Sequence, residues 1–398
     1  MKFSNFNIDK EYILSLRHQL HMYPEVGFDL PNTVALVKDE LEKIGITYTE
    51  KYGKSSIVAT INDEKRDFTI GIRADMDALH IQEKVDLPFK SKIDGVMHAC
   101  GHDAHTAMLL GTAKALYAIR NEINCRIKLL FQPSEEGPES GAKMMLGNGV
   151  MDGIDVIIGL HTENWLPAGT VGVCCGMSMA SSRTFAIEFF GKTAHAVFPQ
   201  SGKDALAMAV KTYGSIQHML TREIDPFAKY VCSISTLNAG ATQNVIADYA
   251  EMKGTIRTYD TQLDEYLINR INAIVKNTAD EVGAEGKVIS SFQCFPVYND
   301  PVISDLVIKS AEKVVGKNHI AEMPIKMSSE DFSYYLTSKP GVLFRLGTKD
   351  IMKEHVSLLH NNDFDIVEDV LYLGSAVCVQ FVLDNMDGIA NTIRGCIY

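Results

Sequence analysis

Residues 96–107 read VMHACGHDAHTA and gather thiol, imidazole and carboxylate groups between two apolar runs. Cys100 and His102 flank one glycine, so both side chains can reach one point just before a helix that we expect to begin near Thr106. Such groups are ligands of Zn²⁺, Mn²⁺, Co²⁺ and Ni²⁺. The stretch therefore predicts a metal site. The alternatives are a solvated, histidine-rich helix cap, or a Cys100 nucleophile that has His98 or His102 as its base.

Carboxylates and a further imidazole follow three apolar, β-branched runs. Asp75 and Asp77 follow FTIGIR, Glu135 and Glu136 follow IKLLFQPS, and His161 closes VIIGL. In parallel sheets, functional groups gather at the carboxyl ends of the strands. In a metal site one glutamate would coordinate a cation while the other accepts a proton from water. The alternative for the glutamate pair is an exposed acidic turn.

The elements that must position these groups change character along the chain. Up to about residue 181, strand and helix patterns alternate, which predicts an α/β domain with a mostly parallel central sheet flanked by helices. Residues 182–290 follow a β-α-β-β-α order typical of an α+β domain with an antiparallel sheet. Helical patterns, a short strand GVLFRLG and a last helix at about 366–384 follow. We predict a discontinuous catalytic domain, 1–181 and 291–398, with 182–290 inserted as a dimerisation or lid domain.

Composition restricts the class of protein. The 398 residues include 46% hydrophobic and 22% charged residues, and the net charge is −12. An acidic chain argues against nucleic acid or an anionic membrane as a partner. No apolar run approaches a membrane span, and the N-terminal residues lack a signal-peptide pattern, so we expect a cytoplasmic protein. The eight cysteines lack the spacing of a disulfide scaffold.

Nine segments of the chain, from about residue 18 to about residue 374, resemble a known family. They are RADMDAL, MHACGHDAHTAMLLG, LLFQPSEEG, GLH, GKTAHA, NVIAD, GTIRTYD, SSEDFSYYL and LLHNNDFDI. Their order is that of the metal-dependent amidohydrolases of the hippurate hydrolase type, which include N-acyl-amino-acid deacylases and are related to aminoacylase and carboxypeptidase G2.

The resemblance implies two divalent metal ions per subunit, Mn²⁺ or Zn²⁺, with Co²⁺ and Ni²⁺ as further options. The residues that match the family's metal ligands are Cys100, His102, Glu136, His161 and His360. Cys100 is implied as a bridge between the ions, and Glu135 matches the general base. Asp75 or Asp77 matches the acid that orients a ligand or that base.

Three more matches lie in the predicted inserted domain. His195 in GKTAHA matches a histidine that reaches the active site of the partner subunit and stabilises the oxyanion. Asn244 and Arg257 match substrate-binding positions, and a guanidinium suits a bidentate grip on an α-carboxylate. For Arg257, a structural ion pair within a strand is the alternative. The resemblance thus implies a homodimer, and the inserted domain could also support a tetramer.

Four positions depart from the family pattern without removing a ligand or the base. His80 and Ala247 stand where proline is usual, and Ala104 and Ser328 stand where glycine is usual. Because these positions fall in turns, they affect loop shape and substrate fit.

The function implied is hydrolysis of the amide bond of an N-acyl amino acid, N-acetyl or N-aroyl, to a carboxylic acid and a free amino acid. The alternative within enzymes is a metallo-exopeptidase of dipeptidase or carboxypeptidase type. A binding module without turnover is a third option, but it would have no need of Glu135. A cysteine hydrolase that uses Cys100 is the fourth, and it should stay active after metal chelation.

Overall fold

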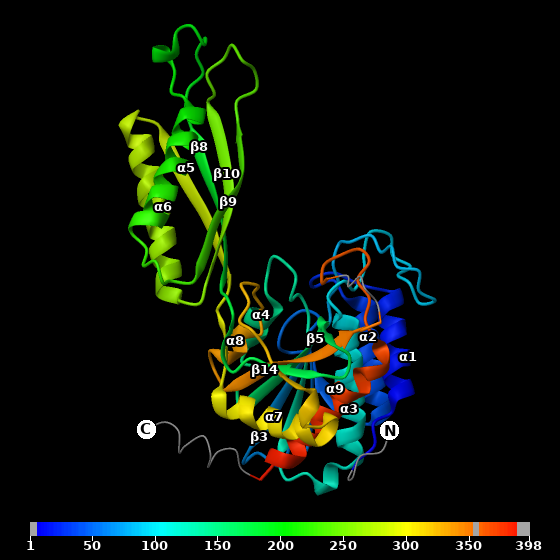
Figure 1. The fold of residues 1–398 in the computed structure, drawn as a ribbon. Helices are drawn as coiled ribbons and strands as arrows, with labels where there is room; N and C mark the ends of the chain where they lie inside the picture. The colour runs from blue at the N-terminus through cyan, green and yellow to red at the C-terminus, as the bar shows by residue number, and fades with distance from the viewer. Residues whose placement is uncertain (1–5, 353–357, 388–398) are drawn as a thin grey trace. The chain divides into compact units, whose positions relative to one another are not determined.

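The computed structural model describes residues 6–352 and 358–387, and the chain divides into two compact units (Figure 1). Unit 1 comprises Met1–Ser178, Tyr298–Ile325 and Asp331–Tyr398, and unit 2 comprises Met179–Val297 and Lys326–Glu330. The predicted inserted domain, 182–290, lies within unit 2. Its predicted end falls inside strand β11 (Glu285–Cys294), which pairs with β8 (Ser182–Phe190) as far as Cys294.

Unit 1 is built on an eight-stranded sheet with the order β1-β2-β4-β3-β5-β14-β6-β13. Its strands are β1 (Thr47–Thr49), β2 (Ile57–Ile61), β4 (Arg126–Gln132), β3 (Thr69–Asp75), β5 (Val156–Pro167), β14 (Gly341–Lys349), β6 (Val171–Val173) and β13 (Ile320–Glu322). The central block β4-β3-β5-β14 is parallel throughout, whereas β1 and β2 join antiparallel. The predicted mostly parallel sheet is confirmed.

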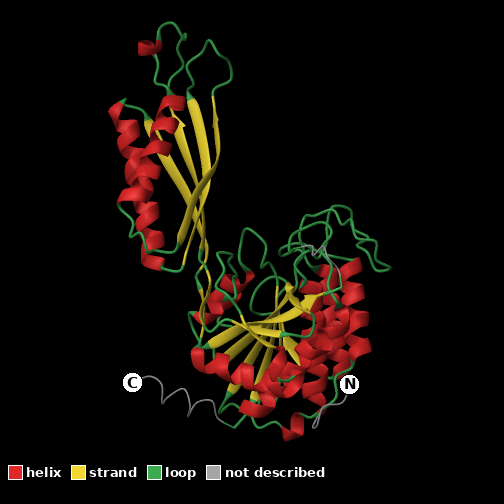
Figure 2. Ribbon diagram, in the orientation of Figure 1, coloured by secondary structure: helices red, strands yellow, loops and turns green. Residues whose placement is uncertain are grey.

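Helices flank this sheet, as Figure 2 shows. They are α1 (Lys10–Met22), α2 (Pro31–Ile44), α3 (His102–Ala118), α4 (Gly141–Gly147), α7 (Pro301–Val315), α8 (Ser333–Leu336) and α9 (Leu371–Asn385). Short 3-10 helices are η1 (Arg120–Glu122), η3 (Lys317–His319) and η4 (Glu368–Val370) in unit 1 and η2 (Pro199–Ser201) in unit 2. Apolar residues of α1, α3, α7 and α9 form one buried cluster with the central strands. Burial of this cluster, rather than local propensity, fixes the helices on the sheet.

Unit 2 is an antiparallel sheet with the order β11-β8-β10-β9. Its other strands are β9 (Tyr230–Ala239) and β10 (Tyr249–Thr258), and its helices are α5 (Ala205–Arg222) and α6 (Thr261–Glu281). Alternate residues of β8 and β10, such as Ile187 and Met252, are buried against both helices. The predicted antiparallel sheet with helices on one face is confirmed. A further two-stranded sheet, β7 (Gly176–Met179) with β12 (Val297–Asn299), forms in the connecting segments.

Three predicted element boundaries were wrong. Helix α3 begins at His102 rather than near Thr106, because Gly101 adopts a left-handed conformation that starts the helix directly after Cys100. His161 does not close a strand: β5 continues to Pro167, because β14 supplies hydrogen-bond partners along that length. The last helix α9 begins at Leu371, after the 3-10 turn η4.

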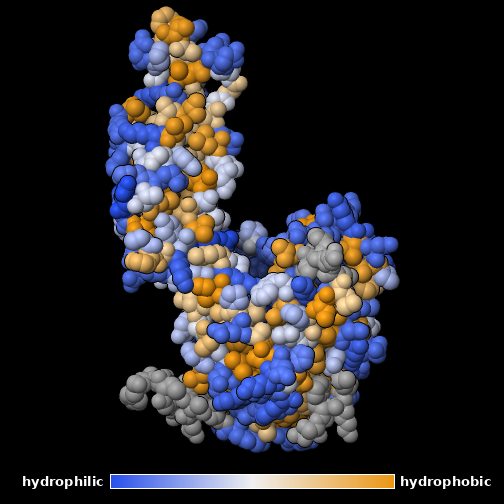
Figure 3. Space-filling model, in the orientation of Figure 1, coloured by the Kyte–Doolittle hydropathy of each residue, from blue (hydrophilic) through white to orange (hydrophobic). Residues whose placement is uncertain are grey.

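None of the described helices is long and apolar enough to span a membrane. Figure 3 shows hydrophilic residues over much of the visible face of each unit, with apolar residues scattered among them. The cytoplasmic location expected from the sequence stays a prediction.

Candidate metal centre

Four segments of unit 1 bring the predicted ligands together. They are the residues that precede and begin α3, the loop after β4, the middle of β5, and the turn around His360. Cys100, His102 and His161 form one group whose possible ligand atoms all lie within 4.8 Å of one another. Cys100 also groups with Glu136 and His360, and His102 groups with Glu135 and Glu136. The shared members make one continuous centre of thiol, imidazole and carboxylate donors.

Individual distances within the centre follow the same pattern. The Sγ atom of Cys100 lies 3.4 Å from Nε2 of His161, and Nε2 of His360 lies 2.8 Å from Oε1 of Glu136. Burial alone would raise the pKa of Glu136, but its contacts with His360 and His102 hold that pKa below its ordinary value. Glu136 is therefore an ionised acceptor near neutral pH.

The ring of His102 is held in the orientation that a metal ligand needs. Its Nδ1–H donates to the backbone carbonyl of Asp77 at 2.8 Å, so Nε2 is the atom that carries the lone pair when the ring is neutral. Nε2 is buried and has no hydrogen-bond partner among the described residues. Burial lowers the pKa of His102, but Asp75 and Asp77 raise it to about 10. A buried, unpartnered nitrogen in a strongly negative environment fits a cation.

His161 is oriented in the same way. Its Nδ1–H donates to the backbone carbonyl of Thr162 at 2.6 Å, which turns Nε2 toward Cys100. Burial and the nearby Arg345 guanidinium hold the pKa of His161 well below its ordinary value, so the ring is neutral. Neutral imidazole is the form that binds metals.

The surroundings of Cys100 argue against a cysteine hydrolase. Burial and the carboxylates of Glu136 and Glu135 raise the pKa of its thiol well above the ordinary value. Burial lowers the pKa of His98 to about 3, so that ring is a poor base at neutral pH, and His102 is engaged with Asp77. A thiol becomes a thiolate in such a place only beside a cation.

Asp77 fixes the two adjacent glutamates through their backbone. Its Oδ1 accepts from the N–H of Glu135 at 2.9 Å and its Oδ2 accepts from the N–H of Glu136 at 3.0 Å. Ser134, immediately before the pair, has φ of +52°, and His360 has φ of +64°. Non-glycine residues rarely adopt this left-handed conformation, which costs of order 1–3 kcal/mol and is typical of functional sites. The backbone is thus held in strained geometry at both places.

Asp75 is a buried carboxylate next to the candidate ligand His102. Its Oδ1 accepts from Nδ1 of His105 at 2.5 Å, and its Oδ2 accepts from Arg73 at 2.5 Å and lies 3.8 Å from Nε2 of His102. Burial raises the pKa of Asp75, but Arg73, His102 and His105 outweigh burial and hold that pKa well below its ordinary value. Asp75 is therefore a permanent buried anion.

Sequence reasoning missed several residues beneath the centre. Arg73 donates to Asp331 at 2.9 Å and to Gln132 at 2.8 Å, and Gln132 donates to Asp331 at 2.8 Å. His105 accepts from the backbone N–H of Thr162 at 2.8 Å, which fixes its tautomer. These residues lie inside RADMDAL, LLFQPSEEG, SSEDFSYYL and MHACGHDAHTA. Arg73 and Gln132 are polar residues within apolar strand patterns, and that pattern could have identified them as buried polar residues near the site.

In unit 2 the structure brings His195 and Asn244 together. The segments that carry them pair, with Ala196 N–H donating to the Asn244 carbonyl at 3.0 Å and Ile246 N–H donating to Ala194 at 2.9 Å. Nδ1 of His195 accepts from the N–H of Val197 at 3.2 Å, so the proton of a neutral His195 ring is on Nε2. The exposed His195 is thus a hydrogen-bond donor.

Arg257 lies near the end of β10 that is farther from Asn244. Asn244 precedes the start of β10 at Tyr249, whereas Arg257 is one residue from the strand's end. The eight steps along the strand from Tyr249 to Arg257 span roughly 26 Å at about 3.3 Å per step. Arg257 is half-buried and donates to Ser329. Within one copy of unit 2, Arg257 and the His195–Asn244 pair are therefore too far apart to touch one small molecule.

The profile of the peptidase family M20/M25/M40 matches residues 71–384. Thermostable carboxypeptidase 1 from Saccharolobus solfataricus is 36% identical over 92% of this chain and 93% of its own length. N-acyl-L-amino acid amidohydrolase from Geobacillus stearothermophilus is 38% identical over 73% of this chain and 78% of its own length.

A solved structure is similar over almost the whole chain. The YXEP protein from Bacillus subtilis, described as a dinuclear metal binding peptidase from the M20 family, superposes with a TM-score of 0.79. It is 30% identical in sequence, and the match covers 96% of this chain and 99% of that one.

Proposed function

The chain belongs to the peptidase family M20/M25/M40, and from that premise we propose that it is a metal-dependent amidohydrolase. Its substrates are N-acyl amino acids, N-acetyl or N-aroyl, and its products are a carboxylic acid and a free amino acid. The carboxypeptidase and the N-acyl-L-amino acid amidohydrolase described above differ in their named substrates, but both names denote hydrolysis of an amide or peptide bond.

The observation that carries the proposal is the donor centre of unit 1, in which Cys100, His102 and His161 are buried. Glu136 is half-buried and His360 is exposed, so the centre opens to solvent on their side. We propose that it holds two divalent cations, Mn²⁺ or Zn²⁺, although the same donors also suit Co²⁺ and Ni²⁺. The proposed ligands are Cys100, His102, Glu136, His161 and His360. The unpartnered Nε2 of His102 and the neutral ring of His161 support this assignment.

Divalent cations at this centre would act as Lewis acids that make water easier to deprotonate and the substrate carbonyl easier to attack. Glu135 is the proposed general base: it accepts a proton from the attacking water and returns it to the leaving amine. Asp77 holds the backbone of Glu135 in place for both transfers. The C–N bond breaks, the water oxygen joins the acyl carbon, and the proton count balances.

We propose that His195 donates from Nε2 to the oxyanion of the tetrahedral intermediate, since its Nδ1 already accepts from Val197. Asn244 and Arg257 are proposed to bind the substrate, with the guanidinium of Arg257 on the α-carboxylate. Arg257 lies near the end of β10, whereas His195 pairs with Val245, which precedes the start of β10. The two must therefore come from different copies of the chain if they contact one substrate.

A homodimer is therefore part of the proposal, and a tetramer could be built from such dimers. The long edge strand β9 supports a subunit interface in unit 2, because nearly all its residues are at least partly exposed and one edge has no neighbour in the described sheet. Exposed edge strands are sites where a second chain can add.

A metallo-exopeptidase is the second candidate, favoured by the carboxypeptidase relative at 36% identity. Both activities attack an amide beside a free α-carboxylate, and they differ in the acyl group that the enzyme accepts.

A substrate panel separates the two candidates. Purified protein is assayed on N-acetyl amino acids, N-benzoyl amino acids and dipeptides, before and after chelation, and again with each metal restored. The proposal predicts N-acyl hydrolysis that chelation abolishes and metal restores. Faster hydrolysis of dipeptides would favour the exopeptidase, and activity indifferent to chelation would contradict both.

A further inference from the structure

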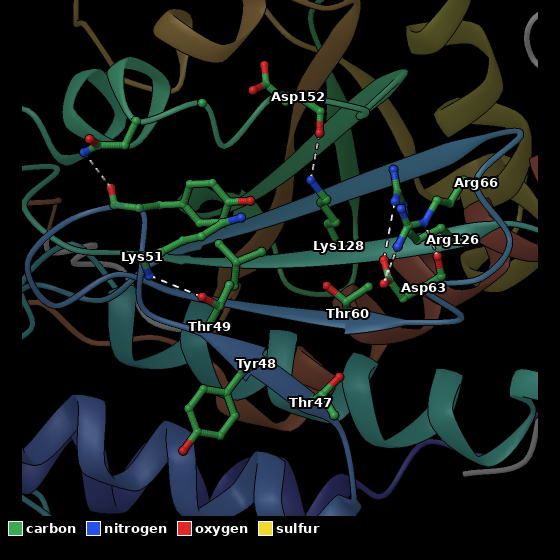
Figure 4. A pocket seen from close by; sticks show the side chains of 14 residues that line it. Thr47, Tyr48, Thr49, Lys51, Thr60, Asp63, Arg66, Arg126, Lys128 and Asp152 are labelled. Atoms are coloured by element: carbon green, nitrogen blue, oxygen red, sulfur yellow. Dashed lines mark hydrogen bonds and ion pairs between the residues drawn. The ribbon is translucent and has the colours of Figure 1, made fainter.

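A surface pocket of about 590 Å³ lies on unit 1, over strands β1, β2 and β4 and the residues that follow α4 (Figure 4). None of the proposed metal ligands lines it. The strands that form its floor are at the edge of the sheet, where β1 and β2 add antiparallel to the parallel block.

The register of the strands sets polar donors side by side on this floor. Thr47 pairs with Thr60, and Thr60 pairs with Lys128, so two hydroxyls and an ammonium group form one cross-strand row. A sheet face that packs against a helix carries apolar side chains, so the polar residues of this row indicate a face that is open to solvent. Among the described residues, neither threonine hydroxyl has a hydrogen-bond partner.

Positive charge exceeds negative charge in the lining. Four cations, Lys51, Arg66, Arg126 and Lys128, face two carboxylates, Asp63 and Asp152. Asp63 is already engaged, because it accepts from Arg66 at 2.8 Å and from Arg126 at 3.4 Å.

The two lysines lack such neutralisation. In the described part of the chain neither Lys51 nor Lys128 forms an ion pair with a carboxylate. Lys128 is only 8% exposed, and its Nζ donates to a backbone carbonyl, that of Asp152, at 2.8 Å. Burial and the nearby Arg126 and Lys51 lower the pKa of Lys128. Two N–H groups of a buried ammonium are thus left for a ligand, in a protein whose net charge is −12.

We propose that this pocket binds a tetrahedral oxyanion, the phosphate group of a small metabolite. The guanidinium of Arg126 is occupied, since it donates to Thr69, Gly153 and Asp63. The guanidinium of Arg66 is engaged as well, because it donates to the backbone carbonyl and to the carboxylate of Asp63. What is left for a ligand is the point charge of two lysines together with hydroxyl donors. This set suits a phosphate better than the flat, bidentate grip that a carboxylate receives from arginine.

Calorimetric titration of the metal-loaded full chain with inorganic phosphate tests the proposal. Lys128→Met, which keeps the aliphatic stem, should weaken phosphate binding at least about tenfold, since it removes a charged hydrogen bond. Lys51→Gln and Thr60→Val, at more exposed positions, should each weaken it by about threefold and carry the test if Lys128→Met does not fold. The matched control is Lys309→Gln, an exposed lysine on α7 outside the pocket.

Further titrations identify the ligand. Sulfate should compete with phosphate, and a phosphomonoester such as glycerol phosphate that binds more tightly than inorganic phosphate would point to a metabolite rather than the free ion. Tighter binding of succinate than of phosphate would overturn the assignment. Phosphate binding that His102→Asn abolishes and the pocket variants leave unchanged would place the anion at the metal centre and would also overturn it.

Discussion

The candidate residues of the two units differ in burial and in the number of hydrogen bonds that orient their side chains. In unit 1, His102 and Asp75 are 0% exposed, and each hydrogen bond that orients them comes from the same unit. In unit 2, His195 and Asn244 are exposed, and one backbone contact orients the His195 ring. In unit 1, three of the five proposed ligands are buried, whereas both candidate residues in unit 2 lie on an exposed surface.

This contrast explains how each half can act. A buried centre holds charges in a low dielectric, where they bind cations strongly and must be fixed by their neighbours. An exposed imidazole gains strength as an oxyanion donor only when water is excluded around it. We therefore expect substitutions of the buried ligands in unit 1 to lower metal content, and substitution of the exposed His195 in unit 2 to lower turnover alone.

The largest effect is expected from removing a buried ligand. Loss of a residue that only hydrogen-bonds a metal ligand lowers metal affinity by up to about 100-fold. His102→Asn removes a proposed ligand itself, so metal affinity should fall by more than about 100-fold, and turnover should fall with it. Metal analysis and a steady-state assay measure both. The paired variant is His195→Asn on the exposed surface of unit 2, which should keep its metal. Equal metal loss in both variants would break the contrast between the units.

Glu135→Gln should separate chemistry from binding within unit 1. The amide keeps the size of the side chain but cannot accept the proton, so turnover should fall by about 10²–10⁴-fold while metal content is unchanged. Glu136→Gln is the matched variant, and it should lose metal as well because Glu136 contacts both His360 and the Cys100 group. The reverse result would show that the roles of the two glutamates are exchanged.

A buried contact between His21 of α1 and Asp103 of α3 should make the stability of the fold depend on pH. When protonated, His21 donates from Nδ1 to Asp103 at 2.8 Å and from Nε2 to Glu83 at 3.2 Å. Burial lowers the pKa of His21, but these carboxylates raise it to about 9. Because the pKa of His21 is higher in the folded state, protonated His21 stabilises the fold, and this contribution is complete below the unfolded-state pKa of 6.5. The contribution is lost as the pH rises through 9.

The expected loss of unfolding free energy between pH 6.5 and 9.5 is about 3 kcal/mol. Urea titrations at several pH values measure it. His21→Gln should remove most of this slope, and the same change at the exposed His218 of unit 2 should not. An unchanged slope in His21→Gln would refute the assignment.

The smallest predicted effect concerns two glycines with the same backbone conformation. Gly101 has φ of +85° and Gly240 has φ of +71°. A Cβ at Gly101 would lie 2.4 Å from Oγ1 of Thr162, whereas one at Gly240 would lie 3.7 Å from its nearest neighbour. Gly240→Ala should cost about 1 kcal/mol from backbone strain alone, and Gly101→Ala about 2–3 kcal/mol. Equal losses of melting temperature would mean that unit 1 is less rigid than we infer.

Local patterns in the sequence indicated most residues of the candidate metal centre, but not the residues that support them. Cys100, His102 and the Glu135–Glu136 pair were recognisable because their neighbours in the chain are also their neighbours in space. His360 became a candidate only through the family resemblance, because one histidine in a turn has no informative spacing. The link between Arg73 and Asp331 joins residues 258 positions apart, and such a contact cannot be read from periodicity.

The fold was predictable to a similar depth. Alternating and continuous apolar runs indicated the strands of both sheets. The residue at which a strand or helix ends also depends on contacts with other parts of the chain, which the local sequence does not show. Strand β5 extends past His161 because β14 pairs with it, and α3 starts early because Gly101 permits the turn. Residues 388–398 of the predicted catalytic domain lie outside the described residues.

Mixing two inactive variants tests most directly whether a buried half-site in one copy is completed by an exposed half-site from another. Glu135→Gln and His195→Gln chains are assayed alone and after dissociation and joint reassembly. Random pairing makes half of the dimers mixed, each with one intact site, so activity should recover to about a quarter of the wild-type value. If mixed dimers form but activity stays at the mean of the two variants, His195 does not act on the partner's metal centre and the account is wrong.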